Sequence, residues 1–235
     1  MTAHRGTIIM VENKQEAQLT TAKFKDTLFR TLFNDSINFL ELYNAVTNEN
    51  HPVNTIVKPC PANELIASFN DLAACIGNQL IVFFEHQSTS SINMPLRLLS
   101  YVTDILRLHI VDKADLFGKK QVMIPTPKFF VLYNGTENLK KTVLKLSDAF
   151  LLQESEPAME LTAKIIDINL NNGDPALNRS ITLQGYSYLN EEIRKNIITG
   201  MTRDMAIATS INLCIKQNIL AEFLIRPLQR GTRYA

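Results

Sequence analysis

A short polar run closes an apolar stretch of the chain and carries residue types that suit metal chemistry. Residues 80–84 are apolar and rich in branched and aromatic types, which predicts a strand buried on both faces. Glu85, His86 and Gln87 follow directly. Because side chains alternate along a strand, Glu85 and Gln87 share one face, and His86 shares the other with Phe84. Carboxylate and amide oxygens are ligands of hard cations such as Mg²⁺.

A cation at this position needs a second carboxylate, and Asp71 lies a short way upstream. The turn signal Gly77-Asn78 predicts a β-hairpin over residues 71–87. A two-residue loop would place Asp71 opposite Phe84. A three-residue loop, or a two-residue loop with a β-bulge, would bring it to the face of Glu85. Directly opposed residues have Cβ atoms about 4.5–5.5 Å apart. The apolar pattern leaves these registers open, and a shared metal site requires one that joins the carboxylates.

These residues also resemble the signature of a known family. Asp71, the run EHQST at 85–89 and the run NMPLR at 93–97 resemble the recombination-promoting nuclease/putative transposase family. That family belongs to the PD-(D/E)xK nuclease superfamily. The similarity continues through residues 124–137, 144–150 and 214–224, so it extends over nearly the whole chain, from Lys25 to Ile225.

The resemblance implies an enzyme that hydrolyses phosphodiester bonds of double-stranded DNA and is associated with recombination or mobile elements. Asp71 and Glu85 would hold Mg²⁺ or another divalent cation. Gln87 stands where the superfamily motif has lysine, so it would belong to the catalytic set without acting as a base. His86, on the opposite face of the strand, is interpreted as structural.

Two further residues are accessory candidates. Asp26 lies in the stretch that resembles the family's N-terminal motif, and is either directed towards the metal or an exposed helix carboxylate. Arg97, near the start of a predicted helix, either contacts a phosphate or pairs with a carboxylate.

The alternative function is a catalytically inactive nucleic-acid-binding or assembly protein that keeps the nuclease fold. The net charge of +1 gives no support to a DNA enzyme, because such proteins are often strongly basic. DNA affinity would have to come from local basic groups, each of which is interpreted as a solvated face. These groups are Lys23/Lys25/Arg30, Lys119/Lys120 and Lys140/Lys141.

The elements that must position the candidate residues follow from apolar periodicity. Asn48–Pro61 is interpreted as a loop or an irregular edge strand, and residues 136–156 give no regular pattern. The predicted helices are a first one from Thr21, then Ser36–Val46, Pro95–Val111, Tyr186–Ile198, Asp204–Lys216 and a turn through Leu224. Besides the hairpin, the predicted strands are Lys128–Tyr133 and residues 159–170.

Together these elements predict an α/β fold, namely a restriction-endonuclease-like mixed β-sheet flanked by helices, with a helical C-terminal extension. The hairpin is expected at the centre of the sheet, with Lys128–Tyr133 parallel to one of its strands. The expected division is a loose leader over 1–20, a nuclease-like domain over 21–170, and the extension over 171–235 with a short disordered tail.

Composition narrows the class of protein. A hydrophobic content of 46% with 20% charged residues is ordinary for a soluble globular chain. No apolar run approaches the roughly 20 residues that cross a bilayer, and no signal-peptide pattern occurs at the start. We therefore expect a cytoplasmic protein without a membrane partner, and consider a homodimer. Cys60, Cys75 and Cys214 have no metal-binding spacing, and the last two are predicted to be buried thiols.

Overall fold

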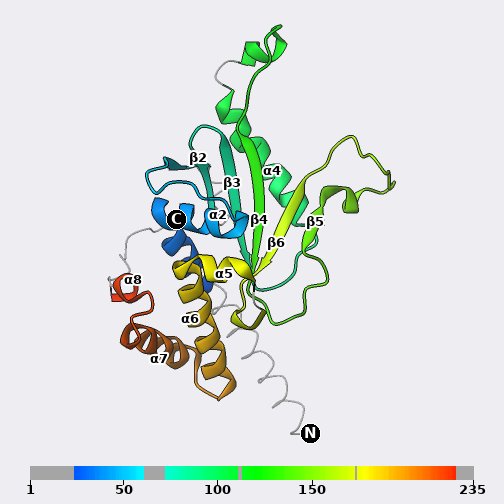
Figure 1. Ribbon diagram of the computed structural model, residues 1–235. Helices are drawn as coiled ribbons and strands as arrows, with labels where there is room; N and C mark the ends of the chain where they lie inside the picture. The colour runs from blue at the N-terminus through cyan, green and yellow to red at the C-terminus, as the bar shows by residue number, and fades with distance from the viewer. Residues whose placement is uncertain (1–23, 61–71, 111–112, 173, 226–235) are drawn as a thin grey trace.

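A six-stranded mixed sheet organises the protein (Figure 1). The computed structural model describes residues 24–60, 72–110, 113–172 and 174–225. The strand order is β1-β2-β3-β4-β6-β5. The strands are β1 (Val57–Pro59), β2 (Leu72–Ile76), β3 (Leu80–Gln87), β4 (Thr126–Tyr133), β5 (Val143–Lys145) and β6 (Thr162–Asp167).

The β2–β3 hairpin takes the register of a three-residue loop. Ile76 pairs with Leu80, and Leu72 pairs with Phe84. Gly77 begins the loop with φ of 57°, in the left-handed region that glycine adopts without a Cβ penalty. Of the registers left open by the sequence, this is the one that the shared metal site needs. Asp71 itself lies outside the described residues, so its distance from Glu85 stays a prediction.

Strand β3 continues into a crossover that returns parallel to it. Helix α4 (Met94–His109) begins after Asn93 with Pro95 in its first turn, where proline costs no hydrogen bond. It ends two residues before the predicted limit. Strand β4 then pairs in parallel with β3, as predicted, with Phe84 opposite Phe130. The two long strands β3 and β4 form the centre of the sheet, so the hairpin is off-centre, with β2 next to the edge strand β1.

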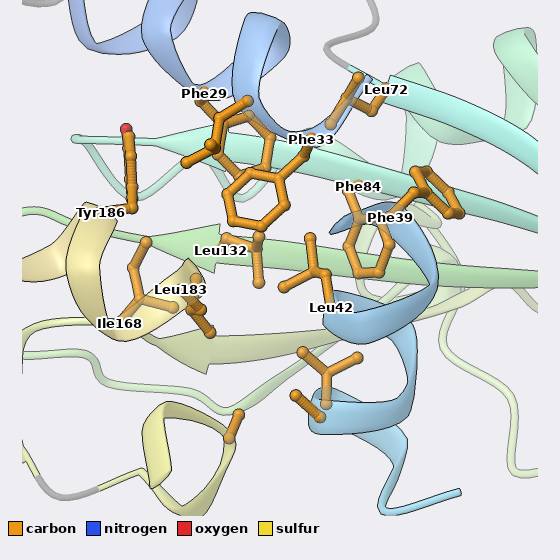
Figure 2. Packing of buried hydrophobic residues seen from close by; sticks show 14 of the residues in the cluster. Phe29, Phe33, Phe39, Leu42, Leu72, Phe84, Leu132, Ile168, Leu183 and Tyr186 are labelled. Atoms are coloured by element: carbon orange, nitrogen blue, oxygen red, sulfur yellow. The ribbon is translucent and has the colours of Figure 1, made fainter. Parts of the chain in front are cut away.

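The two faces of β3 enter separate cores, which explains its apolar run. Val82 and Phe84 pack with the helix over residues 24–33, with α2 (Ser36–Thr47) and with α6 (Ile181–Ile198). Figure 2 shows this core. The rings of Phe39 and Phe84 pack edge to face in it, with 5.2 Å between their centroids. Ile81 and Phe83 point the other way and pack with α4.

The C-terminal helices close one side of the first core (Figure 1). Asp174 caps α5 (Pro175–Arg179) through the Ala176 amide. Helix α6 begins five residues before the predicted start, because Ser180 caps it through the Leu183 amide. Helices α7 (Arg203–Lys216) and α8 (Ala221–Ile225) follow. Cys214 of α7 is buried in the core that α6 shares with β3, which confirms its prediction as a buried thiol.

Short elements account for the main differences from the predicted secondary structure. Strand β5 was not predicted, because in three residues only Leu144 is buried and no alternation can be read. Strand β6 covers only the middle of the predicted strand over 159–170. The single-turn helices η1 (Lys113–Phe117), η2 (Leu146–Ala149) and η3 (Leu170–Asn172) were also not predicted.

The fold class is the predicted one: a mixed sheet flanked by helices with further helices at the C-terminal side, consistent with a restriction-endonuclease-like fold. No helix in the described ranges is long and apolar enough to span a membrane. The division of the chain near residue 170 stays a prediction.

We predict that Gly135→Ala destabilises the fold by about 1–3 kcal/mol, the usual cost of overpacking. A Cβ at this position would collide with the Tyr133 hydroxyl and the Ser88 backbone carbonyl, which lie where β4 and β3 end. Urea unfolding of the variant measures the loss. Gly118→Ala is the control, because its new Cβ would come no nearer than 3.2 Å to the Asp115 oxygen. Equal stability of both variants and the wild type would refute the close approach.

Candidate functional site

The candidate site lies at the carboxyl end of β3, where two polar side chains share one face. Glu85 is 1% exposed and Gln87 is half-buried. Alternation places both on the face of Phe83, towards α4. The end of β3 is held in place because the backbone N–H of Asn134, directly after β4, donates to the backbone carbonyl of Gln87 at 2.8 Å.

Arg97 of α4 joins these two side chains. Its Nη2 lies 3.1 Å from Glu85 Oε2, which forms an ion pair with a nearly fully buried carboxylate. When the Gln87 amide is oriented to satisfy both of its ends, its oxygen accepts from Arg97 Nη1 at 3.2 Å and its nitrogen donates to the Thr89 carbonyl. Arg97 Nε donates to the Tyr101 hydroxyl at 3.2 Å. Of the two roles considered for Arg97, the structure therefore shows the carboxylate pair.

The donor set suits a hard cation. An oxygen of Glu85 and an oxygen of Gln87 converge on one positive group, and Mg²⁺ takes such oxygen ligands. A second carboxylate would have to come from Asp71, which immediately precedes β2 in the sequence. Among the described residues there is no group of three or more His, Cys, Asp or Glu side chains that could hold a metal ion.

His86 and Asp26 meet on the opposite face of β3. His86 is buried, with Nδ1 3.1 Å from Asp26 Oδ1 and Nε2 3.0 Å from the Tyr186 hydroxyl. Its ring stacks on Phe29 with 5.1 Å between centroids. These contacts agree with a structural role for His86. They also place Asp26 beside His86 rather than on the face of Glu85, so Asp26 is not brought to the candidate metal ligands.

A second polar network, which we call the Asn134 cluster (Lys25, Asn134, Asn169, Glu191 and Arg194), lies at the same end of the sheet. Lys25 Nζ donates to Asn134 Oδ1 at 3.3 Å. Arg194 Nη2 donates to the Asn134 carbonyl at 3.1 Å and also contacts Oδ1. Arg194 Nη1 pairs with Glu191 at 2.8 Å, and Asn169 Oδ1 accepts from Asn134 and Arg194. The cluster ties the first described helix and α6 to the end of β4.

Sequence reasoning missed this cluster and misjudged one of its members. Lys25 was interpreted as part of a solvated basic face, yet it is only 8% exposed. Burial is the main reason that the pKa of Lys25 falls from 10.5 to about 8, and Arg194 lowers it further, while Asp26 and Glu191 act in the opposite direction. Nothing local to Lys25 or Arg194 in the sequence indicated that they meet at the end of β4.

Comparison with known proteins identifies a family. The sequence model of the family described as "Putative transposase, YhgA-like" matches residues 76–214, more than half of the chain. The match includes Glu85, Gln87 and Arg97, and begins after Asp71. No curated protein and no solved structure matches the chain.

We predict that Arg97→Met lowers the free energy of unfolding by about 1–3 kcal/mol, the cost of leaving a buried charge without its partner. Urea unfolding at neutral pH measures the change. Arg107→Met is the matched control on the same helix, because its ion pair with Asp104 is exposed, and such pairs contribute about 0–1 kcal/mol. Equal losses in both variants would show that Arg97 does not compensate a buried charge.

We predict that Lys25 makes stability rise with pH in the alkaline range. Its pKa is lower in the folded state, so between pH 8 and 10.5 the unfolded chain binds more protons, and folding becomes more favourable as pH increases. From pH 7.5 to 9.5 the wild type should gain about 2 kcal/mol relative to Lys25→Met. Urea unfolding at both pH values gives this difference.

The exposed Lys120→Met is the control, and its stability should follow the wild type at both pH values. If Lys25→Met instead shows the same pH dependence as the wild type, the lysine is not desolvated in the folded state.

Proposed function

The chain belongs to the YhgA-like family of putative transposases, and from that premise we propose that it is a Mg²⁺-dependent endonuclease that hydrolyses phosphodiester bonds of DNA. The family description associates the chain with mobile elements and implies interaction with DNA. Metal dependence, double-stranded DNA as substrate and membership of the PD-(D/E)xK superfamily are parts of the proposal.

One observation carries the proposal: the Glu85 carboxylate and, in the orientation that satisfies both ends of its amide, the Gln87 oxygen converge on the Arg97 guanidinium at the end of β3. A buried carboxylate that serves only packing is costly, because its charge must be desolvated. The three-residue hairpin loop adds support. It gives the register, with Leu72 paired to Phe84, that the predicted approach of Asp71 to Glu85 requires.

Each residue then has a distinct role. Asp71 and Glu85 would hold the metal, which when bound would supply an activated water and stabilise charge on the phosphate. Gln87 would position the water through its amide but could not take up a proton, because an amide is not a base. Arg97 holds Glu85 in position and can turn one of its donors towards a phosphate oxygen.

The alternative function, a non-catalytic nucleic-acid-binding or assembly protein, is favoured by the same ion pair. Arg97 already neutralises Glu85, so the carboxylate does not need a metal for its compensation. The net charge of +1 also provides no general attraction to DNA. A homodimer and a cytoplasmic location stay predictions.

We predict that purified protein nicks supercoiled plasmid with Mg²⁺ and does not with EDTA. Asp71→Ala and Glu85→Ala should each lose at least about a hundredfold in rate, because each removes a ligand of the essential ion. In the same proteins, Mn²⁺ should raise the melting temperature of the wild type but not of Glu85→Ala, since a ligand stabilises only the state that binds it.

Two controls separate metal chemistry from folding. His86→Ala should keep most of the activity, because His86 faces the other side of the sheet. Asp148→Ala removes an exposed carboxylate that pairs with Lys141 and should change nothing. If the folded wild type neither nicks DNA nor gains melting temperature with Mn²⁺, the nuclease proposal is refuted and the non-catalytic alternative remains. Equal loss in His86→Ala and Glu85→Ala, with folding intact, would refute the assigned roles.

A further inference from the structure

Two thiols lie in contact across the edge of the sheet. Cys60 directly follows β1, Cys75 lies in β2, and their Sγ atoms are 3.6 Å apart. Both residues are half-buried, so the prediction of a buried Cys75 is wrong: β2 lies next to the short edge strand, which covers it incompletely. Cys214, the third thiol, lies in the separate core beyond the other face of the sheet.

We propose that Cys60 and Cys75 form an oxidation site, at which a small-molecule disulfide converts the two thiols into an intramolecular disulfide bond between β1 and β2. This site involves neither Glu85, Gln87 nor Arg97. Its chemistry therefore stands apart from the proposed nuclease reaction.

The reaction is a pair of thiol–disulfide exchanges. The thiolate of one cysteine attacks a sulfur of the oxidant, whose S–S bond breaks and releases one small thiolate. The second cysteine, as thiolate, then attacks the protein sulfur of this mixed disulfide and releases the other half. The protein loses two S–H bonds and gains one S–S bond. The oxidant is reduced to two thiols, which take up the two protons.

The strand geometry allows the bond only if β1 moves, and the strain that remains makes such a bond easier to reduce. Pro59 pairs with Ala74, so Cys60 stands opposite Ala73, and Cys75 is its diagonal neighbour on the same face. Diagonal neighbours have Cα atoms about 7–8 Å apart, whereas disulfides usually need about 4.4–6.8 Å. Strand β1 must therefore move towards Cys75. It can do so because it is only three residues long and pairs on one side only.

The surroundings of Cys60 determine how its reactivity depends on pH. Burial, and secondarily the neighbouring Cys75, raise the pKa of the Cys60 thiol. Because only the thiolate attacks a disulfide, exchange through Cys60 should be slow at neutral pH and faster under alkaline conditions. A mildly alkaline buffer is therefore the appropriate condition for the test.

The position of the pair in the sequence suggests what oxidation would regulate. Residues 61–74, which lie between the two cysteines, include Asp71. A disulfide would close a covalent ring that contains Asp71, and it would displace β1, the edge strand that pairs with β2. This consequence rests on the proposed function, in which Asp71 holds the metal. Oxidation is then expected to slow DNA cleavage.

The test of the bond uses the Cys214→Ala variant, which keeps only the two thiols in question. After incubation with oxidised glutathione at pH 8.5, mass spectrometry of a non-reduced digest should show the peptides of Cys60 and Cys75 joined, with the loss of two hydrogens. Adding Cys60→Ser to this background should leave only a glutathione adduct on Cys75. Adducts on both cysteines without a cross-link, or no reaction at all, would overturn the proposal.

The regulatory consequence is tested by plasmid nicking with Mg²⁺. The cross-linked protein should cleave several-fold more slowly than the same protein reduced with dithiothreitol, and reduction should restore the rate. The variant with Cys60→Ser should show no difference between the two treatments. Equal or faster cleavage by the cross-linked form overturns the regulatory role. Failure of the reduced protein to cleave overturns the nuclease proposal and the regulatory role together, while mass spectrometry alone decides the cross-link.

Discussion

The burial of one carboxylate, that of Glu85, sets the main electrostatic constraint on this structure. A charged carboxylate that is 1% exposed at the end of a central strand is costly unless a cation lies beside it. Arg97 meets this need only because α4 begins soon after β3 and turns back along the same face. The crossover helix is thus both a packing element for Ile81 and Phe83 and the support of the polar site.

Local patterns were sufficient to predict the part of the fold that carries the candidate ligands. The apolar run of β3, its polar end and the Gly77 turn depend on neighbours in the sequence, and the structure confirms the strand, the hairpin and the parallel partner β4. The loop length was left open by the sequence, and the structure shows three residues. Alternation alone separated Glu85 from His86 onto opposite faces, and both lie there. The contact between Asp71 and Glu85 stays a prediction, because Asp71 lies outside the described residues.

Long-range contacts could not be predicted in the same way. Lys25 has the sequence environment of an exposed helix residue, and its burial results from Asn134 and Arg194, which are distant in sequence. Asp26 was considered either as a residue directed towards the metal or as an exposed helix carboxylate, and its contact with the distant His86 was not foreseen. A metal role for Asp26 stays a prediction. Similarly, three residues of β5 hold too little pattern to indicate a strand.

The Asn134 cluster also affects the order in which the protein can assemble during synthesis. Lys25 and Asn134 are 109 residues apart, and the Tyr186 hydroxyl donates to the Lys25 carbonyl across 161 residues. Contacts of such separation require closing very long loops, which makes them late events in folding. A ribosome-bound chain whose α6 has not yet left the ribosome therefore lacks the Asn134 cluster at its strand ends. The candidate site would therefore reach its final geometry only after residues 181–198 have been synthesised and released from the ribosome, which delays any activity until that point.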